Sequence, residues 1–496
     1  MKLLALRIHE HDSNISYFDG KCVKYFSTER YFSEKHHSII PSELLQKNPD
    51  LNLVSNYIKK LNNLLNTVFS ISVDDVDVIG IVVGDYWFTN ELFVKKEIGF
   101  NKPTFIIDHH LAHHFSTWPV EKPTTYGFVF DGQGNNCITH SLFKNGKLID
   151  YFDRHRDGSI ASRMKLIGRS LRFSGAFESQ NKELDLAGKV MGYQSYGDID
   201  YDFYEHLNSF TLKDVYEAWT YPYFGSQISY IDWLRTVHEW TGDRLVDYFS
   251  KYKGTKSFTG GTAQSSVFNG KLYKHFDMEF SPTVSDAGLS LGVLEILRLI
   301  KGIEPFPTDG FPFWQCTDES PELTDKIQIK KIAEELAKGK IVGVYQGQGE
   351  VGPRALGNRS ILMDPSIKDG KDIINNKVKH RESFRPFGAA CLLEDAQLYF
   401  EAPKEIPYMN VNVDVKTDEF PSITHVDNST RLQTVKEGVF YEILTEFKKL
   451  TGYGVLLNTS LNIAGKPIAS KTEHAKQIFN STELDAIFCG NEAQLK

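Results

Sequence analysis

Two histidines four residues apart are the first side chains of this chain that could bind a metal ion. His109 and His113 stand in the stretch HHLAHH. If this stretch begins a helix, the two imidazoles lie on one face with Cβ atoms about 6 Å apart. That spacing suits two ligands of one metal ion. A hydrogen-bonded histidine cluster at a helix start is the alternative.

Two carboxylates extend this candidate metal site. Asp131 ends a short apolar strand and precedes Gly132 and Gly134, and Asp286 lies in a Ser-Asp-Ala-Gly segment before an apolar helix. Two histidines and two aspartates together suit Fe(II), Mn(II) or Zn(II). An open coordination position on such an ion could polarise a carbonyl group or bind a substrate oxygen.

A second group of candidate residues is cationic and lies in the last third of the chain. Arg354 and Arg359 stand among glycines in GEVGPRALGNRSIL, and Lys379, Arg381 and Arg385 follow in VKHRESFRPF. Unpaired buried charge is costly, so five cations beside Phe and Pro have no purpose in a packed core. Arginine forks and backbone N–H groups are what a triphosphate requires. A solvated basic face is the alternative.

Three further features could bind a nucleotide or a small amide. Gly260 and Gly261 follow a predicted strand, where backbone N–H groups can approach a phosphate, although a tight turn would also explain the pair. Arg431 lies in the segment STRLQ. Asn458 and Asn462, in LNTSLN after another predicted strand, could bind a small amide or a nucleobase edge.

The elements that must position these residues follow a pattern that occurs twice. Predicted strands at 15–18 and 22–28 flank Asp19-Gly20, a hairpin signal, after a first strand at 2–8. Later, the strand before Asp131 is followed by a second hairpin signal at Asn145-Gly146. The repeat predicts an internally duplicated α/β domain with ribonuclease-H-like halves, as in actin- and hexokinase-type ATPases.

The remaining segments predict an insertion and a second domain. Residues 198–253 have helical spacing and many aromatic residues, which indicates a helical insertion. Residues 302–321 are rich in Pro, Gly and Asp and form the best candidate linker. An amphipathic helix at 324–339 and a strand at 341–346 then begin a second α/β domain. We expect the domain boundary near residue 322.

The composition limits the class of protein. A length of 496 residues is too great for one ordinary domain, and 41% hydrophobic residues provide material for real cores. The net charge of -8 gives no general attraction for nucleic-acid backbones. Five scattered cysteines without a CxxC motif indicate reduced thiols. We find no signal peptide and no apolar stretch that could span a membrane, and therefore expect a cytoplasmic protein.

Several motifs, in a fixed order, resemble the O-carbamoyltransferase family of nodulation and antibiotic biosynthesis over nearly the whole chain. The matching segments are His11-Asp12-Ser13, Glu29-Arg30 with Lys35, HHLAH at 109–113, Asp131-Gly132, GKVMG at 188–192, Gly260-Gly261, SDAG at 285–288, GPRALGNRS at 352–360, RPF at 385–387 and NTSLN at 458–462.

This resemblance implies a fold and a two-stage reaction. Residues 1–322 would form a Kae1-like carbamoyl-transfer domain, and residues 323–496 a YrdC-like domain. The YrdC-like domain would make carbamoyl adenylate from carbamoyl phosphate and ATP, with Mg²⁺ accompanying the ATP. The intermediate would move inside the protein to the Kae1-like domain. There an acceptor hydroxyl would attack the carbamoyl carbon beside a metal ion, usually Fe(II), and AMP would leave.

The resemblance also implies roles for individual residues. The metal ligands would be His109, His113, Asp131 and Asp286. Contacts to carbamoyl phosphate, ATP or the adenylate would come from Lys35, Arg354, Arg385, Arg431 and Asn458. We expect His11 to take the proton from the acceptor, because an imidazole suits that step near neutral pH. A hydrogen-bond donor to nucleotide or acceptor is the alternative role for His11.

The acceptor stays open between two classes. It could be a sugar or natural-product hydroxyl, or a hydroxymethyl group on a nucleobase such as 5-hydroxymethylcytosine in nucleic acid. The second is suggested by the aromatic residues of the insertion, which could stack on bases, although a helical core would also explain them. The aromatic residues are Tyr201, Phe203, Tyr204, Trp219, Tyr221, Tyr223, Trp233 and Trp240.

Departures from the family pattern concern the acceptor rather than the chemistry. They are Asn14, the segments 192–197 and 264–266, and the loops around 85–104, which look trimmed. Two other functions remain as alternatives: a threonylcarbamoyl-type tRNA modification enzyme, and a non-enzymatic actin-like nucleotide-binding protein. The second leaves the C-terminal cations unexplained. A homodimer is compatible with the sequence.

Overall fold

The computed structural model describes most of the chain. The described residues are 1–8, 10–40, 51–82, 101–120, 124–153, 157–178, 180–222, 228–278, 280–316 and 320–496. Most of the loop region that looks trimmed in the sequence, and Tyr223 of the insertion, lie outside them. Within the described residues, no helix is both long and apolar enough to cross a membrane.

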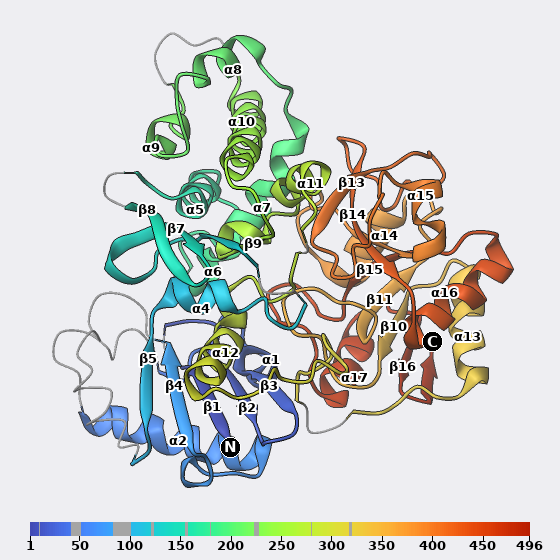
Figure 1. Ribbon diagram of the computed structural model, residues 1–496. Helices are drawn as coiled ribbons and strands as arrows, with labels where there is room; N and C mark the ends of the chain where they lie inside the picture. The colour runs from blue at the N-terminus through green and yellow to red at the C-terminus, as the bar shows by residue number, and fades with distance from the viewer. Residues whose placement is uncertain are drawn as a thin grey trace.

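The described part of the chain folds into mixed α/β structure with three sheets (Figure 1). The second sheet repeats the order of four of the five strands of the first. The first has the order β3 (Val23–Ser27), β2 (Asn14–Phe18), β1 (Leu3–Arg7), β4 (Val78–Val82) and β5 (Thr104–Ile107). The second has the order β8 (Lys147–Asp153), β7 (Ile138–Lys144), β6 (Tyr126–Phe130) and β9 (Lys256–Thr259).

Both sheets are built in the same way from their first strand. β1 pairs antiparallel with β2 and parallel with β4, and β6 pairs antiparallel with β7 and parallel with β9. Both predicted hairpins are present. In the second, Asn145 and Gly146 have φ values of 49° and 75°, a left-handed conformation that Asn and Gly tolerate. The predicted repeat of strand and hairpin is therefore a repeat in the structure.

Helices cover these sheets and connect them. α12 (Leu289–Lys301) packs against β1, β2, β4 and α4 (His109–Phe115), and every side chain from Leu289 to Leu297 is buried. The other helices of this part are α1 (Thr28–Phe32), α2 (Leu51–Phe69), α5 (Ile160–Ser170), α6 (Gln180–Glu183), α7 (Leu186–Tyr193) and α11 (Ser266–His275).

The predicted insertion is helical. It contains α8 (Tyr201–Leu207), α9 (Val215–Ala218) and α10 (Tyr230–Ser250), which stand above the second sheet at the top of Figure 1. Trp219, Trp233 and Trp240 are buried in its core. For these three tryptophans, core packing explains the aromatic content.

The third sheet forms the C-terminal part, on the right of Figure 1. Its order is β13 (Val411–Asp414), β14 (Ser429–Val435), β12 (Gly388–Leu392), β15 (Val455–Ser460), β11 (Arg359–Met363), β10 (Val342–Tyr345), β16 (Ala486–Cys489) and β17 (Glu492–Leu495). The helices of this part are α13 (Lys326–Ala337), α14 (Gly370–Ile374), α15 (Ala396–Tyr399), α16 (Gly438–Thr451) and α17 (Thr472–Ser481).

Candidate functional site

The predicted metal ligands converge at the start of α4. β5 leads to Asp108, whose carboxylate accepts a hydrogen bond from Leu111 N (2.9 Å) and caps the helix. His109 and His113 then lie one turn apart, and both are buried. The helix therefore presents two imidazoles to one point, as the spacing predicts.

Asp131 and Asp286 complete this cluster. His109 Nε2 lies 3.2 Å from Asp131 Oδ2, and His113 Nε2 lies 3.2 Å from Asp286 Oδ1. One ligand atom from each of the four residues lies within 4.8 Å of those of the other three. The neighbouring His110 and His114 turn elsewhere, toward Ser141 and Phe143.

The two carboxylates are held as metal ligands usually are. The second oxygen of Asp131, Oδ1, accepts a hydrogen bond from Gly261 N (2.7 Å), and Oδ2 of Asp286 accepts one from Arg7 (3.1 Å). In each carboxylate one oxygen is fixed by the protein and the other faces the histidines. Such fixed donor sets fit a divalent cation. Burial lowers the pKa of His109, but the charges of Asp286 and Asp131 outweigh this and leave that pKa raised.

Gly260 and Gly261 have a structural explanation. Gly260 has a φ of 89°, and a Cβ there would lie 2.4 Å from the carbonyl oxygen of Phe130. The turn therefore requires glycine, and it aims the N–H of Gly261 at Asp131 rather than into open space. Gly261 also lines the cavity described next, whereas Gly260 does not.

A single cavity of about 1160 Å³ joins this cluster to the C-terminal part. Its lining comes from both parts of the chain. The predicted site residues in it are His11, Lys35, His109, Asp131, Gly261, Asp286, Arg354, Arg381, Arg385, Arg431 and Asn462.

Four of the cations gather at the C-terminal side of the cavity. Among the described residues, the guanidinium groups of Arg354 and Arg431 have no hydrogen-bond or ion-pair partner, while that of Arg385 lies 3.7 Å from Glu382. Burial, with the neighbouring charge of Arg385, lowers the pKa of Arg354 to about 10. Burial and the charges of Arg385 and Arg354 also lower the pKa of Arg381. Burial and the charges of the other three arginines lower the pKa of Arg431. These four guanidinium groups repel one another and outnumber the neighbouring carboxylate of Glu382, so they form a site for anions.

Arg359 and Lys379 have structural partners instead. Arg359 donates to the carbonyl oxygens of Gln346, Gly347 and Asn358, and its guanidinium lies 3.7 Å from the ring centre of Tyr345. The inference that none of the five cations serves the packed core is therefore wrong for this residue.

Lys379 and Asn458 hold loops beside the cavity without lining it. Lys379 Nζ donates to the carbonyl oxygens of Ser460 (2.7 Å) and Asn462 (2.9 Å). The same inference is therefore wrong for Lys379. The amide of Asn458 donates to the carbonyl oxygen of Ala355 (3.2 Å), next to Arg354. Direct substrate contacts of Arg359, Lys379 and Asn458 stay predictions.

His11 and Lys35 line the opposite wall within one polar network. His11 Nδ1 lies 2.9 Å from Asp12 Oδ2 and 3.8 Å from Asp286 Oδ2. Lys35 Nζ lies 2.6 Å from Asp185 Oδ2. With Nδ1 bonded to Asp12, His11 has Nε2 left for a substrate.

The sequence interpretation missed Arg7, Arg30 and Asp185 as members of the site. Arg7 is fully buried, and a charge inside the apolar strand LLALRI was the available signal. Arg30 donates to the carbonyl oxygens of Glu350 and Gly352, and so fixes the glycine segment beside Arg354. Asp185 lies 150 positions from Lys35, and no local pattern pairs them.

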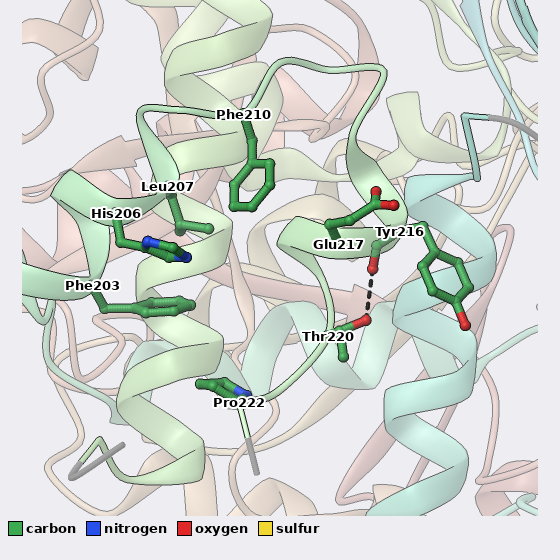
Figure 2. A pocket seen from close by; sticks show the side chains of 8 residues that line it. All are labelled: Phe203, His206, Leu207, Phe210, Tyr216, Glu217, Thr220 and Pro222. Carbon is green, nitrogen blue, oxygen red and sulfur yellow. Dashed lines mark hydrogen bonds between the residues drawn. The ribbon is translucent and has the colours of Figure 1, made fainter. Parts of the chain in front are cut away.

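A smaller hollow of about 370 Å³ lies in the insertion (Figure 2). Phe203, His206 and Phe210 surround it with Thr220, whose hydroxyl donates to the carbonyl oxygen of Tyr216 (2.7 Å). No residue of the insertion lines the large cavity among the residues that the structure describes. The aromatic insertion therefore gives no direct support for base stacking at the metal cluster.

Comparison with known proteins identifies the class of this α/β protein. A family model for the carbamoyltransferase C-terminus matches residues 333–496. The chain is 30% identical over 460 residues to the uncharacterized protein MJ1058 of Methanocaldococcus jannaschii, covering 80% of this chain and 75% of that protein. It is 38% identical over 260 residues to nodulation protein NolO of Bradyrhizobium diazoefficiens, covering 47% of each.

A named enzyme is also similar. The chain is 35% identical over 243 residues to the 3'-hydroxymethylcephem-O-carbamoyltransferase of Streptomyces clavuligerus, covering 45% of this chain and 46% of that enzyme. The chain belongs to the O-carbamoyltransferase family of enzymes. The matches to NolO and the cephem enzyme span less than half of those proteins.

Similarity to solved structures is weaker. The structure of HypF from T. kodakarensis is 10% identical, covers 61% of this chain and 48% of that chain, and gives a TM-score of 0.39. Likeness at this level does not define the fold.

Proposed function

We propose that this chain is an ATP-dependent O-carbamoyltransferase that acts in two stages within one cavity. Carbamoyl phosphate would first be hydrolysed by water to carbamate and phosphate, and the carbamate oxygen would then attack the α-phosphorus of ATP to give carbamoyl adenylate and pyrophosphate. The carbamoyl group would then move to an acceptor hydroxyl, and AMP would leave. The observation that carries the proposal is one cavity with an arginine cluster on one side and a His/Asp cluster on the other. An enclosed path would protect the adenylate from water.

The arginine cluster would serve the first stage. Arg354, Arg385 and Arg431 would hold the phosphates of ATP, which arrives with Mg²⁺, and of carbamoyl phosphate. Their charges would stabilise the negative charge that develops as pyrophosphate leaves. Arg385→Ala should abolish carbamoyl-phosphate-dependent pyrophosphate release from ATP while metal content stays unchanged. Normal pyrophosphate release in this variant would remove Arg385 from the first stage.

The His/Asp cluster would serve the second stage. Fe(II), Mn(II) or Zn(II) held by His109, His113, Asp131 and Asp286 would supply a Lewis acid. His11, oriented by Asp12, would take the proton of the acceptor hydroxyl at Nε2. His109→Ala combined with His113→Ala should remove the metal and block transfer, while acceptor-free pyrophosphate release continues. Undiminished metal content by elemental analysis would reject the ligand assignment.

The proposal includes domain identities. Residues 1–322 would form the Kae1-like domain with its ribonuclease-H-like halves, supported by the repeated strand order of the first two sheets. Residues 323–496 would form the YrdC-like domain. The family comparisons favour this reaction over the threonylcarbamoyl-type alternative, which would use threonine and bicarbonate in place of carbamoyl phosphate.

The acceptor is tested by screening. The purified protein is incubated with ATP, carbamoyl phosphate and candidate acceptors, which include sugars and hydroxymethylcytosine in DNA. Mass spectrometry of the products then looks for a gain of one carbamoyl group. A chain that releases no pyrophosphate and carbamoylates no acceptor would overturn the proposed function.

A further inference from the structure

α5 forms part of the cavity wall beside the metal cluster. Ser159 Oγ donates to the carbonyl oxygen of Asp131 (2.9 Å), and Ser162 Oγ donates to that of Gly132 (3.3 Å). The first turn of α5 is therefore fixed directly beside a predicted metal ligand.

One face of α5 lines the cavity with positive charge. Ala161, Lys165 and Arg169 follow one another at intervals of four residues, and all three line the cavity. Four residues of helix rise about 6 Å, so these side chains form a row that leads away from the cluster. The sequence of α5, IASRMKLIGRS, has no acidic residue.

The acidic residues around this part of the cavity have partners within the protein. Glu29 accepts a hydrogen bond from the backbone N–H of His36, and burial raises its pKa. Four other carboxylates contact basic side chains: Glu10 with Arg7, Asp12 with His11 and His36, Glu183 with Arg169, and Asp185 with Lys35.

Unlike the basic side chains that contact these carboxylates, Lys165 has an ammonium group without a partner in the described part of the chain. It has no hydrogen-bond or ion-pair partner among the residues that the structure describes, although it lines the cavity. A positive charge that the protein leaves unpaired beside a reaction site favours an anionic ligand.

An aromatic ring stands next to this row. Phe177 lines the cavity, is 64% exposed and has a φ of 65°. The guanidinium of Arg169 lies 4.8 Å from its ring centre. An exposed ring beside cations offers a stacking surface for a flat ring that carries a phosphate.

We propose that the acceptor is a nucleotide whose phosphate binds Lys165 and Arg169, whose base stacks on Phe177 and whose hydroxyl faces the metal cluster. This inference rests on the proposed function and specifies its acceptor. Such a phosphate could belong to a free nucleotide or to one nucleotide of a single-stranded nucleic acid. The two sources are separated by experiment.

The experiment compares three acceptors with the same hydroxyl. They are 5-hydroxymethyl-2'-deoxycytidine, its 5'-monophosphate, and a single-stranded oligonucleotide that contains it. We expect KM to be about 10- to 100-fold lower for a phosphate-bearing acceptor than for the nucleoside, as a charge-assisted contact of this kind provides. Preference for the monophosphate or for the oligonucleotide identifies the source. Equal use of the nucleoside would overturn the proposal.

Charge reversal at Lys165 tests the residue itself. Lys165→Glu should raise KM for the phosphate-bearing acceptor by a similar factor and leave KM for the nucleoside and acceptor-free pyrophosphate release unchanged. Lys165→Arg should retain low KM. Lys147→Glu, at an exposed hairpin residue, makes the same change in net charge and should have no effect.

Three outcomes show whether the inference or the proposed function has failed. Slower acceptor-free pyrophosphate release in Lys165→Glu would assign this lysine to the first stage and overturn the inference alone. Wild-type protein that releases pyrophosphate but carbamoylates none of the three acceptors would do the same. Absence of pyrophosphate release in the wild type would instead overturn the proposed function.

Discussion

The buried guanidinium of Arg7 compensates the negative charge of the His/Asp cluster. Arg7 is fully buried and contacts Asp286 and Glu10 at 3.1 and 3.2 Å. Removing one partner of a buried pair leaves an uncompensated charge and costs about 3–5 kcal/mol. Arg7→Met should therefore destabilise the metal-free protein by about that amount in urea unfolding. Added divalent metal should restore part of the loss, because it supplies positive charge at the same carboxylates.

An exposed pair is the control for Arg7. Lys449 contacts Glu446 on the surface of α16, and Lys449→Met should cost about 0–1 kcal/mol. A similar small loss in Arg7→Met would show that Asp286 does not depend on the guanidinium.

His36 makes stability depend on pH. Burial lowers its pKa, but Asp12 and Asp185 outweigh this and raise the pKa well above its ordinary value. Above about pH 6.5 the folded protein then keeps a proton that the unfolded chain releases. The stabilisation is complete below that pH and is lost as the pH rises through the folded pKa.

His36→Asn tests this dependence, because Asn tolerates the left-handed conformation of residue 36 (φ 55°). The variant should lose more unfolding free energy at about pH 6 than at about pH 9, with a slope of at most about 1.4 kcal/mol per pH unit. Urea titrations across this range measure it. Equal losses at both ends would contradict the raised pKa.

For single residues, side chains at helical spacing could be predicted from the sequence, whereas the partners of a side chain far away in the sequence could not. His109 and His113 were found from their spacing, Asp131 from its position at a strand end, and Asp286 from its place in a Ser-Asp-Ala-Gly segment before an apolar helix. Arg359 and Lys379 have the same residue types as cavity cations, and only the fold shows that carbonyl oxygens neutralise them. Lys165 was missed because a lysine on an amphipathic helix has no local sign of being unpaired.

The position of α4 depends on its close contact with α12. A Cβ at Gly292 would lie 1.8 Å from the carbonyl oxygen of Ala112, between the two histidine ligands. Gly292→Ala must therefore push α4 away from α12. We expect a loss of about 1–3 kcal/mol in urea unfolding and a lower metal content.

Gly188 provides a matched control. It lies within α7, and a Cβ there would have no atom within 4 Å. Gly188→Ala should stabilise the protein by about 0.5–1 kcal/mol and leave metal content unchanged. A Gly292→Ala protein as stable as this control would show that the helices do not depend on the contact.

Elements with local signals were predicted well. The Asp19-Gly20 and Asn145-Gly146 turns identified both hairpins, and the recurrence of a strand followed by such a hairpin predicted the repeat. The order of the third sheet carries no such signal. β10 pairs with β16 and β12 pairs with β14 across long stretches of chain, and these pairings are set by packing rather than by turn residues.

Across the whole molecule, the cavity is closed by contacts between its N- and C-terminal sides. His425 Nε2 donates to the carbonyl oxygen of Gly192 (3.1 Å), and Lys189 Nζ contacts Glu382 (2.5 Å). Glu382 lies 3.7 Å from Arg385 as well. Such contacts between distant segments could not be predicted from either segment alone. In the proposed reaction they close the path between the two clusters.

Lys189 tests whether this closure protects the intermediate. Its side chain is 8% exposed, so Lys189→Ala removes a nearly buried contact and leaves Glu382 without it. Water should then reach the adenylate more easily, and pyrophosphate released per carbamoyl group transferred should rise by up to about fivefold, since a loss of about 1 kcal/mol changes an equilibrium by about that factor. The charge-swapped protein Lys189→Glu with Glu382→Lys should recover part of the coupling. A ratio that stays at the wild-type value in Lys189→Ala, with pyrophosphate release intact, would show that the ion pair does not seal the cavity.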